Sequence, residues 1–156
     1  MRIGFIVSEY NPLHYGHIKL MQKSKEELAL DAICCVMSGD FVQRGEVAVA
    51  DKYTRAKWAI QAGADLVIEN PVEFVLGSAQ VFADGALKVV DYFDCEKYLC
   101  FGSECGSVYA LEKIADILEC DESQHYIKEG LSQGLSYAKC QSYALEKYLD
   151  AHNIDK

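Results

Sequence analysis

Short apolar runs and stretches of helical periodicity alternate along the first part of the chain. The apolar runs are rich in branched or aromatic residues and end at polar turns, which is typical of buried strands. Strands that alternate with helices predict parallel pairing through right-handed crossovers. The pattern therefore predicts a Rossmann-like, three-layer α/β/α fold with a parallel sheet. The expected strands cover residues 2–7, 31–37, 65–69 and 97–101.

Polar residues and glycine mark the ends of the expected helices. The first helix starts near His14, Asp51 is a plausible N-cap of a second that Gly63 ends, and Ser78 caps a third that runs to about Tyr92. Later in the chain no convincing strand follows, so we expect a helical C-terminal segment. Its candidate helices cover residues 107–118, 122–133 and 136–152.

The composition favours one compact domain over residues 1–156, because 51% of the residues are hydrophobic and supply a core. No apolar stretch approaches the roughly 18 residues of a membrane span. The N-terminus also lacks the basic, apolar and cleavage regions of a secretory signal. We therefore expect a cytoplasmic protein with no membrane partner.

Seven cysteines raise the question of disulfide bonds or a zinc site. Their number is odd and no Cys-x-x-Cys pair occurs, so we expect reduced thiols and no metal site. Two of them lie inside an expected strand, where cysteine behaves as a small apolar residue. The seven are Cys34, Cys35, Cys95, Cys100, Cys105, Cys120 and Cys140.

The net charge of −9 disfavours a broad nucleic-acid interface, which depends on lysine and arginine. The one dense basic cluster consists of Arg44, Lys52, Arg55 and Lys57. Such a cluster can contact nucleic acid or can form a solvated helix face. For the last three residues, we favour a structural role in stabilising the second helix.

A His-x-Gly-His sequence follows the first expected strand and opens the first helix. Helix N-termini attract anions, because their first N–H groups lack partners and the helix dipole is positive there. His14 and His17 share one face of the first turn, and Gly16 leaves room for a phosphate. We expect a phosphate site, the alternatives being half of a metal site or ordinary surface histidines.

Two further polar turns follow expected strands, at Ser38–Glu46 and at Gly102–Glu104. The carboxyl ends of parallel strands meet at one edge of a sheet, so these turns are expected to converge on the His-x-Gly-His turn. Glu9 and Glu104 end strands and are candidates to face magnesium, a ribose or a substrate amine. The alternative is that either carboxylate caps a helix or pairs with a lysine.

Four sequence blocks together resemble the N-terminal part of bacterial tRNA(Met) cytidine acetate ligases, members of the HIGH-motif nucleotidyltransferase superfamily. In order and spacing they are far more specific than the His-x-Gly-His sequence alone. The blocks are Glu9–His17, Ser38–Glu46, Asp51–Lys57 and Phe101–Glu104.

The resemblance implies a ligase that activates acetate with ATP as acetyl-adenylate and acetylates the wobble cytidine of elongator tRNA(Met). It also implies which residues bind ATP; Leu13 and Tyr15 replace the commoner phenylalanine and asparagine but leave both histidines intact. The implied residues are Val7, Ser8, Glu9, Tyr10, Asn11, Pro12, Leu13, His14, Tyr15, Gly16, His17, Ile18, Lys19, Leu20 and Gly102.

Adenylation requires charge stabilisation on the phosphates and alignment of a carboxylate. We expect His14 and His17 to supply that stabilisation, and Arg44 to hold acetate, pyrophosphate or RNA through its planar donors. The alternative for Arg44 is an ion pair with Glu46 or Asp40. Magnesium is expected with ATP, without a named protein ligand.

Members of the resembled family are much longer and carry a Pro-Asn-Asn segment, an arginine that completes the phosphate site and a tRNA-contacting helical region. We therefore expect an N-terminal part or a short relative, with weak or no tRNA contact of its own. The alternative functions are a small-molecule adenylyltransferase and a non-catalytic nucleotide-binding module.

Overall fold

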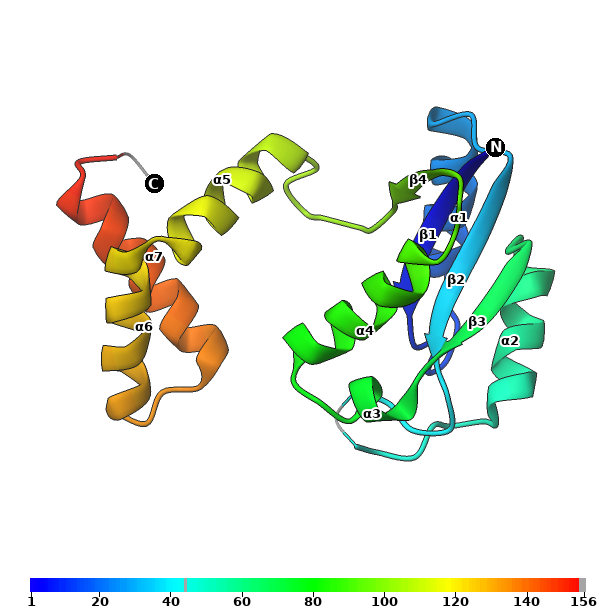
Figure 1. Cartoon of the computed structure of the whole chain (residues 1–156), viewed down its shortest axis with the longest axis horizontal. Helices are drawn as coiled ribbons and strands as arrows, with labels where there is room; N and C mark the ends of the chain where they lie inside the picture. The colour runs from blue at the N-terminus through cyan, green and yellow to red at the C-terminus, as the bar shows by residue number, and fades with distance from the viewer. Residues whose placement is uncertain (44, 155–156) are drawn as a thin grey trace. The chain divides into compact units, whose positions relative to one another are not determined.

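The computed structural model describes residues 1–43 and 45–154, and the chain divides into two compact units, Met1–Gly102 and Ser103–Lys156. Unit 1 (Met1–Gly102) contains the sheet, and unit 2 (Ser103–Lys156) is helical (Figure 1). Each unit has a hydrophobic core of its own. The expectation that residues 1–156 act as one domain stays a prediction.

Unit 1 is built on a four-stranded parallel sheet in the order β3-β2-β1-β4. The chain moves outward from β1 to β3 and then returns to place β4 on the other side of β1. This reversal creates a switch point between β1 and β4, where open α/β sheets bind ligands. The strands are β1 (Arg2–Ser8), β2 (Ala32–Ser38), β3 (Leu66–Asn70) and β4 (Glu96–Leu99).

Helices cover both faces of this sheet, as the expected three-layer fold requires (Figure 1). Side chains alternate between the faces, so Cys35 packs with Met21 and Ala59 while Cys34 packs with Ala86 and Val90. Both thiols are buried in β2, as expected. The covering helices are α1 (Tyr15–Glu27) and α2 (Lys52–Gln61) on the first face and α4 (Ala79–Asp91) on the second.

The expected N-caps of α2 and α4 are confirmed by their hydrogen bonds. Asp51 Oδ1 accepts the N–H groups of Tyr53 and Thr54, each at 3.0 Å. Ser78 Oγ accepts the Val81 N–H at 3.3 Å. The strands differ from expectation by one or two residues at their ends.

One helix, α3 (Val72–Val75), was not expected from the sequence, because a single turn is too short to show helical periodicity. It follows Asn70-Pro71, at which β3 ends. The Asn70 side chain is buried and donates to the Phe82 carbonyl at 3.2 Å. This contact joins the end of β3 to α4.

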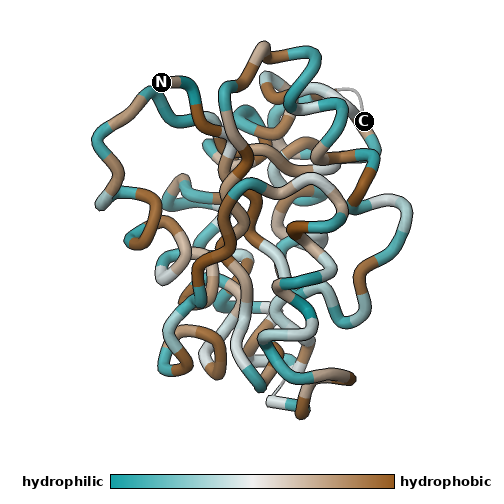
Figure 2. Tube along the Cα trace, turned by 90° about the vertical axis from the view of Figure 1, so that its right-hand side faces the viewer, coloured by the Kyte–Doolittle hydropathy of each residue, from teal (hydrophilic) through white to brown (hydrophobic). Residues whose placement is uncertain are grey.

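Unit 2 consists of α5 (Val108–Glu119), α6 (Asp121–Ser132) and α7 (Tyr137–Ala151), close to the expected bounds. Its core is small and consists of Ile127, Cys140 and Ala144 with their partly buried neighbours. Gly130 allows α6 and α7 to approach, since a Cβ there would lie 2.9 Å from the Cys140 sulfur. Along the trace, hydrophobic stretches are interrupted by hydrophilic segments (Figure 2). No described helix is long and apolar enough to cross a membrane.

Arg55 joins the ends of two strands from inside the unit. Its guanidinium is fully buried, so a solvated position is wrong for this member of the basic cluster. It donates to the carbonyls of Glu9 at 2.5 Å and Ser38 at 3.1 Å, and also to that of Gly39. Its Nε donates to the Ala50 carbonyl at 3.0 Å. The role is structural, as expected, but it concerns the strand ends more than the helix.

We predict that Arg55→Met destabilises unit 1 by about 3 kcal/mol or more, because the buried carbonyls of Glu9, Ser38 and Gly39 would lose their charged donor. Trp58, the one tryptophan of the chain, lies in α2 and reports unfolding of unit 1 by fluorescence in urea. Lys57→Met removes an exposed cation from the same helix and should cost less than about 0.5 kcal/mol. Equal unfolding midpoints for the two variants would contradict the prediction.

Candidate functional site

A cavity of about 430 Å³ opens at the carboxyl end of β1, beside the switch point. Eight of its nine lining residues belong to the segment from Val7 to Leu20 that the sequence indicated. Sequence reasoning missed the ninth, Phe82, since its place on an apolar helix face predicted only packing. The lining residues are Val7, Ser8, Glu9, Tyr10, Asn11, Pro12, His14, His17 and Phe82.

The other expected nucleotide-binding residues lie outside this cavity's lining. Leu13 and Ile18 line a second cavity of about 430 Å³ together with Trp58, and Leu20 packs against the core. Tyr15, Gly16 and Lys19 lie on the exposed side of the first turns of α1. Gly102 follows β4 and is exposed, and a Cβ built on it would meet open space. Arg44 falls outside the described residues.

The two histidines of the turn cap helix α1 reciprocally. His14 Nδ1 accepts the Gly16 N–H at 3.1 Å, and His17 Nδ1 accepts the His14 N–H at 3.2 Å. The two rings stack, with centroids 3.7 Å apart. The Gly16 N–H, one of those expected to face a phosphate, is thus directed to an imidazole instead. The N–H groups of His17 and Ile18 are directed to the His14 carbonyl.

This capping arrangement determines which ring nitrogen carries the proton. A neutral imidazole has one donor and one acceptor nitrogen, and each Nδ1 here is the acceptor. We therefore assign the proton of each neutral ring to Nε2. Burial lowers the pKa of His17, and the neighbouring His14 lowers it further, which favours the neutral ring.

Tyr10 supports this pair from beneath. Its ring meets that of His17 edge to face, with centroids 5.0 Å apart, and its hydroxyl lies 3.1 Å from the Cys35 sulfur. The side chain is 1% exposed, and burial raises the pKa of the phenol. Its φ of 46° lies in the left-handed region, which is costly for a tyrosine. The packing of the ring offsets this cost.

The loop after β2 is held against the same edge of the sheet. Glu9 Oε1 accepts the Gln43 N–H at 2.6 Å, and Asn11 Oδ1 accepts the Val49 N–H at 2.7 Å. This contact with the loop is neither the helix cap nor the lysine pair considered as alternatives for Glu9. Its expected role facing magnesium, a ribose or a substrate amine stays a prediction. Glu104 lies in unit 2 and is exposed. The expected convergence of the first two turns is thus confirmed by direct contacts.

No group of three His, Cys, Asp or Glu side chains among the described residues is arranged to hold a metal ion. Glu9 is the carboxylate in the lining of the first cavity, and one of its oxygens is engaged by Gln43.

Similar proteins include curated relatives that are much longer than this chain. The tRNA(Met) cytidine acetate ligases of Clostridium perfringens and Acetivibrio thermocellus are each 44% identical to it, over 98% and 99% of its length. The ligase of Clostridium acetobutylicum is 46% identical over 97%. The chain spans only 38–39% of these relatives.

A solved structure shares the fold. The crystal structure of Thermotoga maritima TmcAL bound with alpha-thio ATP matches 98% of this chain and 37% of its own, with a TM-score of 0.87 and 39% identity. The match supports the α/β architecture with a helical C-terminal part.

The family model described as HIGH Nucleotidyl Transferase matches residues 1–156. This match includes the histidine turn, the loop after β2 and all four strands of the sheet. The chain belongs to the HIGH nucleotidyltransferase family.

Proposed function

We propose that unit 1 binds ATP with its phosphates against His14 and His17, as the nucleotide-binding part of a ligase that forms acetyl-adenylate. The acceptor proposed is the wobble cytidine of elongator tRNA(Met). The names of the relatives and the ATP analogue in the Thermotoga maritima structure support this proposal. The observation that carries it is the reciprocal cap: both Nδ1 atoms accept backbone N–H groups, which leaves Nε2 of each ring to carry the proton, and both histidines line the first cavity.

The geometry suits phosphate chemistry. Two neutral donors and the positive end of the α1 dipole stabilise negative charge without a buried cation. Attack by acetate on the α-phosphate would join a carboxylate oxygen to phosphorus and release pyrophosphate, so charge develops on the phosphates that these donors face. The contribution of Arg44 to holding acetate, pyrophosphate or RNA stays a prediction. Magnesium, when bound with ATP, would offset the charge of the phosphates.

Exchange of labelled pyrophosphate into ATP tests the adenylation step. We expect exchange that depends on acetate, measured on this chain and on the longer Clostridium perfringens ligase as a positive control. Exchange without acetate would favour a small-molecule adenylyltransferase and overturn the ligase proposal. ATP binding with no exchange for any carboxylate would favour a nucleotide-binding module.

We predict that His14→Asn and His17→Asn each weaken ATP binding by tenfold or more, the cost of about 1.5–3 kcal/mol for a lost charge-assisted donor. Asparagine is a good N-cap residue, so the first variant keeps a side-chain acceptor for the Gly16 N–H. Calorimetry measures the affinity, and Lys23→Met, which removes an exposed cation from α1, is the matched control. Unchanged ATP affinity in both histidine variants would contradict a phosphate site at these histidines.

The stacked pair also predicts a pH effect. Because the folded pKa of His17 lies below the ordinary 6.5, the neutral cap stabilises unit 1 fully above pH 6.5. This stabilisation is lost as the pH falls through the folded pKa. His14→Asn removes one cause of the shift, so the pKa of His17 should rise towards 6.5 in an NMR titration of its ring protons. An unchanged or lower pKa of His17 in this variant would contradict this account of the pair.

A further inference from the structure

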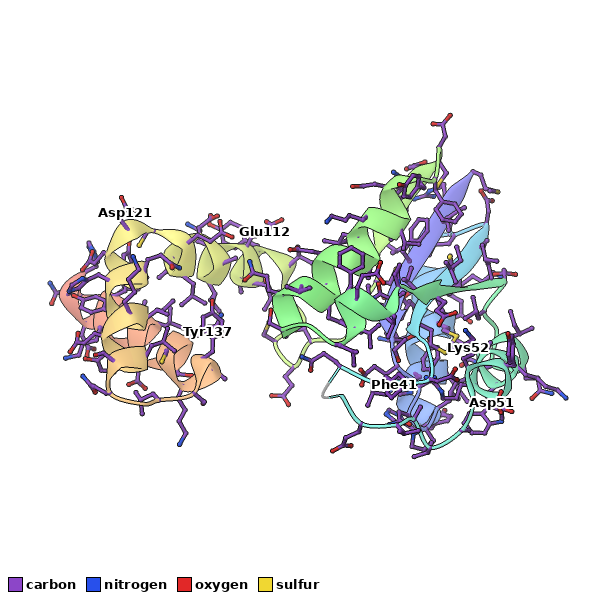
Figure 3. The ribbon with its side chains drawn as sticks, turned by 60° about the horizontal axis from the view of Figure 1, so that its bottom comes forward. Phe41, Asp51, Lys52, Glu112, Asp121 and Tyr137 are labelled. Carbon is purple, nitrogen blue, oxygen red and sulfur yellow. The ribbon has the colours of Figure 1, made fainter. Side chains whose placement is uncertain are left out.

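A smaller cavity of about 220 Å³ lies at the same edge of the sheet, between the ends of β2 and β3 and the start of α2. Figure 3 marks Lys52, which contributes to this cavity, beside the α2 N-cap Asp51. Met37, Ala56 and Val67 form its apolar part, and these three side chains also pack in or against the core of unit 1. The full lining is Met37, Ser38, Lys52, Tyr53, Ala56, Val67 and Glu69.

The polar part of this cavity is an ion pair open to solvent. Lys52 Nζ lies 2.7 Å from Glu69 Oε2, and the two side chains are 29% and 45% exposed. The Glu69 carboxylate rests against Gly39, where a Cβ would collide with it. The Lys52 ammonium lies 5.7 Å from the ring centroid of Tyr53, which is itself largely exposed. A hydrogen-bond acceptor, Glu69, and a donor, Lys52, therefore lie side by side next to the apolar part of the cavity.

The two charges cancel, so a small anion such as acetate would gain from Lys52 and lose to Glu69. A neutral, planar ligand that carries a donor next to an acceptor complements both groups. Cytosine and adenine edges both have this order, because in each an amino group donates and the neighbouring ring nitrogen accepts. The acceptor named in the proposed function selects cytosine between the two. We propose that this cavity is the subsite for an aminopyrimidine base, with the amino group on Glu69, the ring nitrogen on Lys52 and the ring beside Tyr53.

The cavity lies where a base that accepts the acetyl group of acetyl-adenylate could bind. This part of the inference rests on the proposed function. Ser8, Met37 and Glu69 occupy one row across three adjacent strands, since Ser8 pairs with Met37 and Met37 with Glu69. Paired residues of neighbouring strands share a face and lie about 5 Å apart, so about 10 Å separates Glu69 from Ser8. Ser8 lines the first cavity, so the two sites are neighbours on one surface.

NMR titration of this chain with cytidine, and with uridine as the matched ligand, tests the proposal. Uridine presents an acceptor where cytidine presents the amino donor, so Glu69 should repel it. We expect cytidine to shift the signals of the Met37 methyl and the Tyr53 ring, and to bind about tenfold more tightly than uridine.

Glu69→Gln keeps the size of the side chain against Gly39 but offers an amide that can donate as well as accept. The preference for cytidine over uridine should collapse in this variant. Lys97→Met removes a lysine from another exposed ion pair and should leave the preference unchanged. A preference retained in Glu69→Gln would overturn the proposal. So would shifts of these signals by acetate but not by cytidine, which would indicate a carboxylate site.

A parallel ATP titration separates the two proposals. Cytidine selectivity that depends on Glu69 but occurs without any ATP binding would support this subsite and overturn the proposed nucleotide site. ATP binding without cytidine shifts at Met37 and Tyr53 would do the reverse.

Discussion

The buried guanidinium of Arg55 is the constraint on which the ligand edge of unit 1 depends. It donates to the carbonyls of Glu9, Ser38 and Gly39, which lie at the ends of β1 and β2. Burial lowers the pKa of this guanidinium, yet an arginine stays charged at neutral pH. Because the two strand ends are joined to α2, the histidine turn and the loop after β2 keep a common position. Both cavities at this edge rely on that position.

The histidine turn serves the helix and the candidate ligand site with the same atoms. Each Nδ1 accepts a backbone N–H at the start of α1, and this assigns the proton of each neutral ring to Nε2. Tyr10 adds support from the core, at the cost of a left-handed backbone. The same two imidazoles therefore form the helix cap and the pair of donors. A substitution tests ligand affinity alone only when it preserves the cap.

Much of unit 1 was predictable because its signals are local. The runs that became β1 and β2 are apolar enough to be buried on both faces, and Asp51 and Ser78 cap their helices through neighbours two or three residues away. The polar turns after β1 and β2 converge because parallel strands end at one edge. The single turn α3 escaped prediction because it is too short to show periodicity. The place of Phe82 in the first cavity escaped prediction because an apolar helix face predicts packing and not a ligand site.

The sequence by itself determined the alternation of strands and helices, the caps and the candidate histidine site, because each depends on residues close together in the chain. Only the tertiary structure decided the burial of Arg55 against Glu9, which lies 46 residues away, and the pairing of Lys52 with Glu69 in the smaller cavity. The sequence of a basic cluster does not show which of its side chains are solvated and which are buried. The difference arises when the strand order brings backbone carbonyls and a carboxylate to one helix, and that order is a property of the folded sheet.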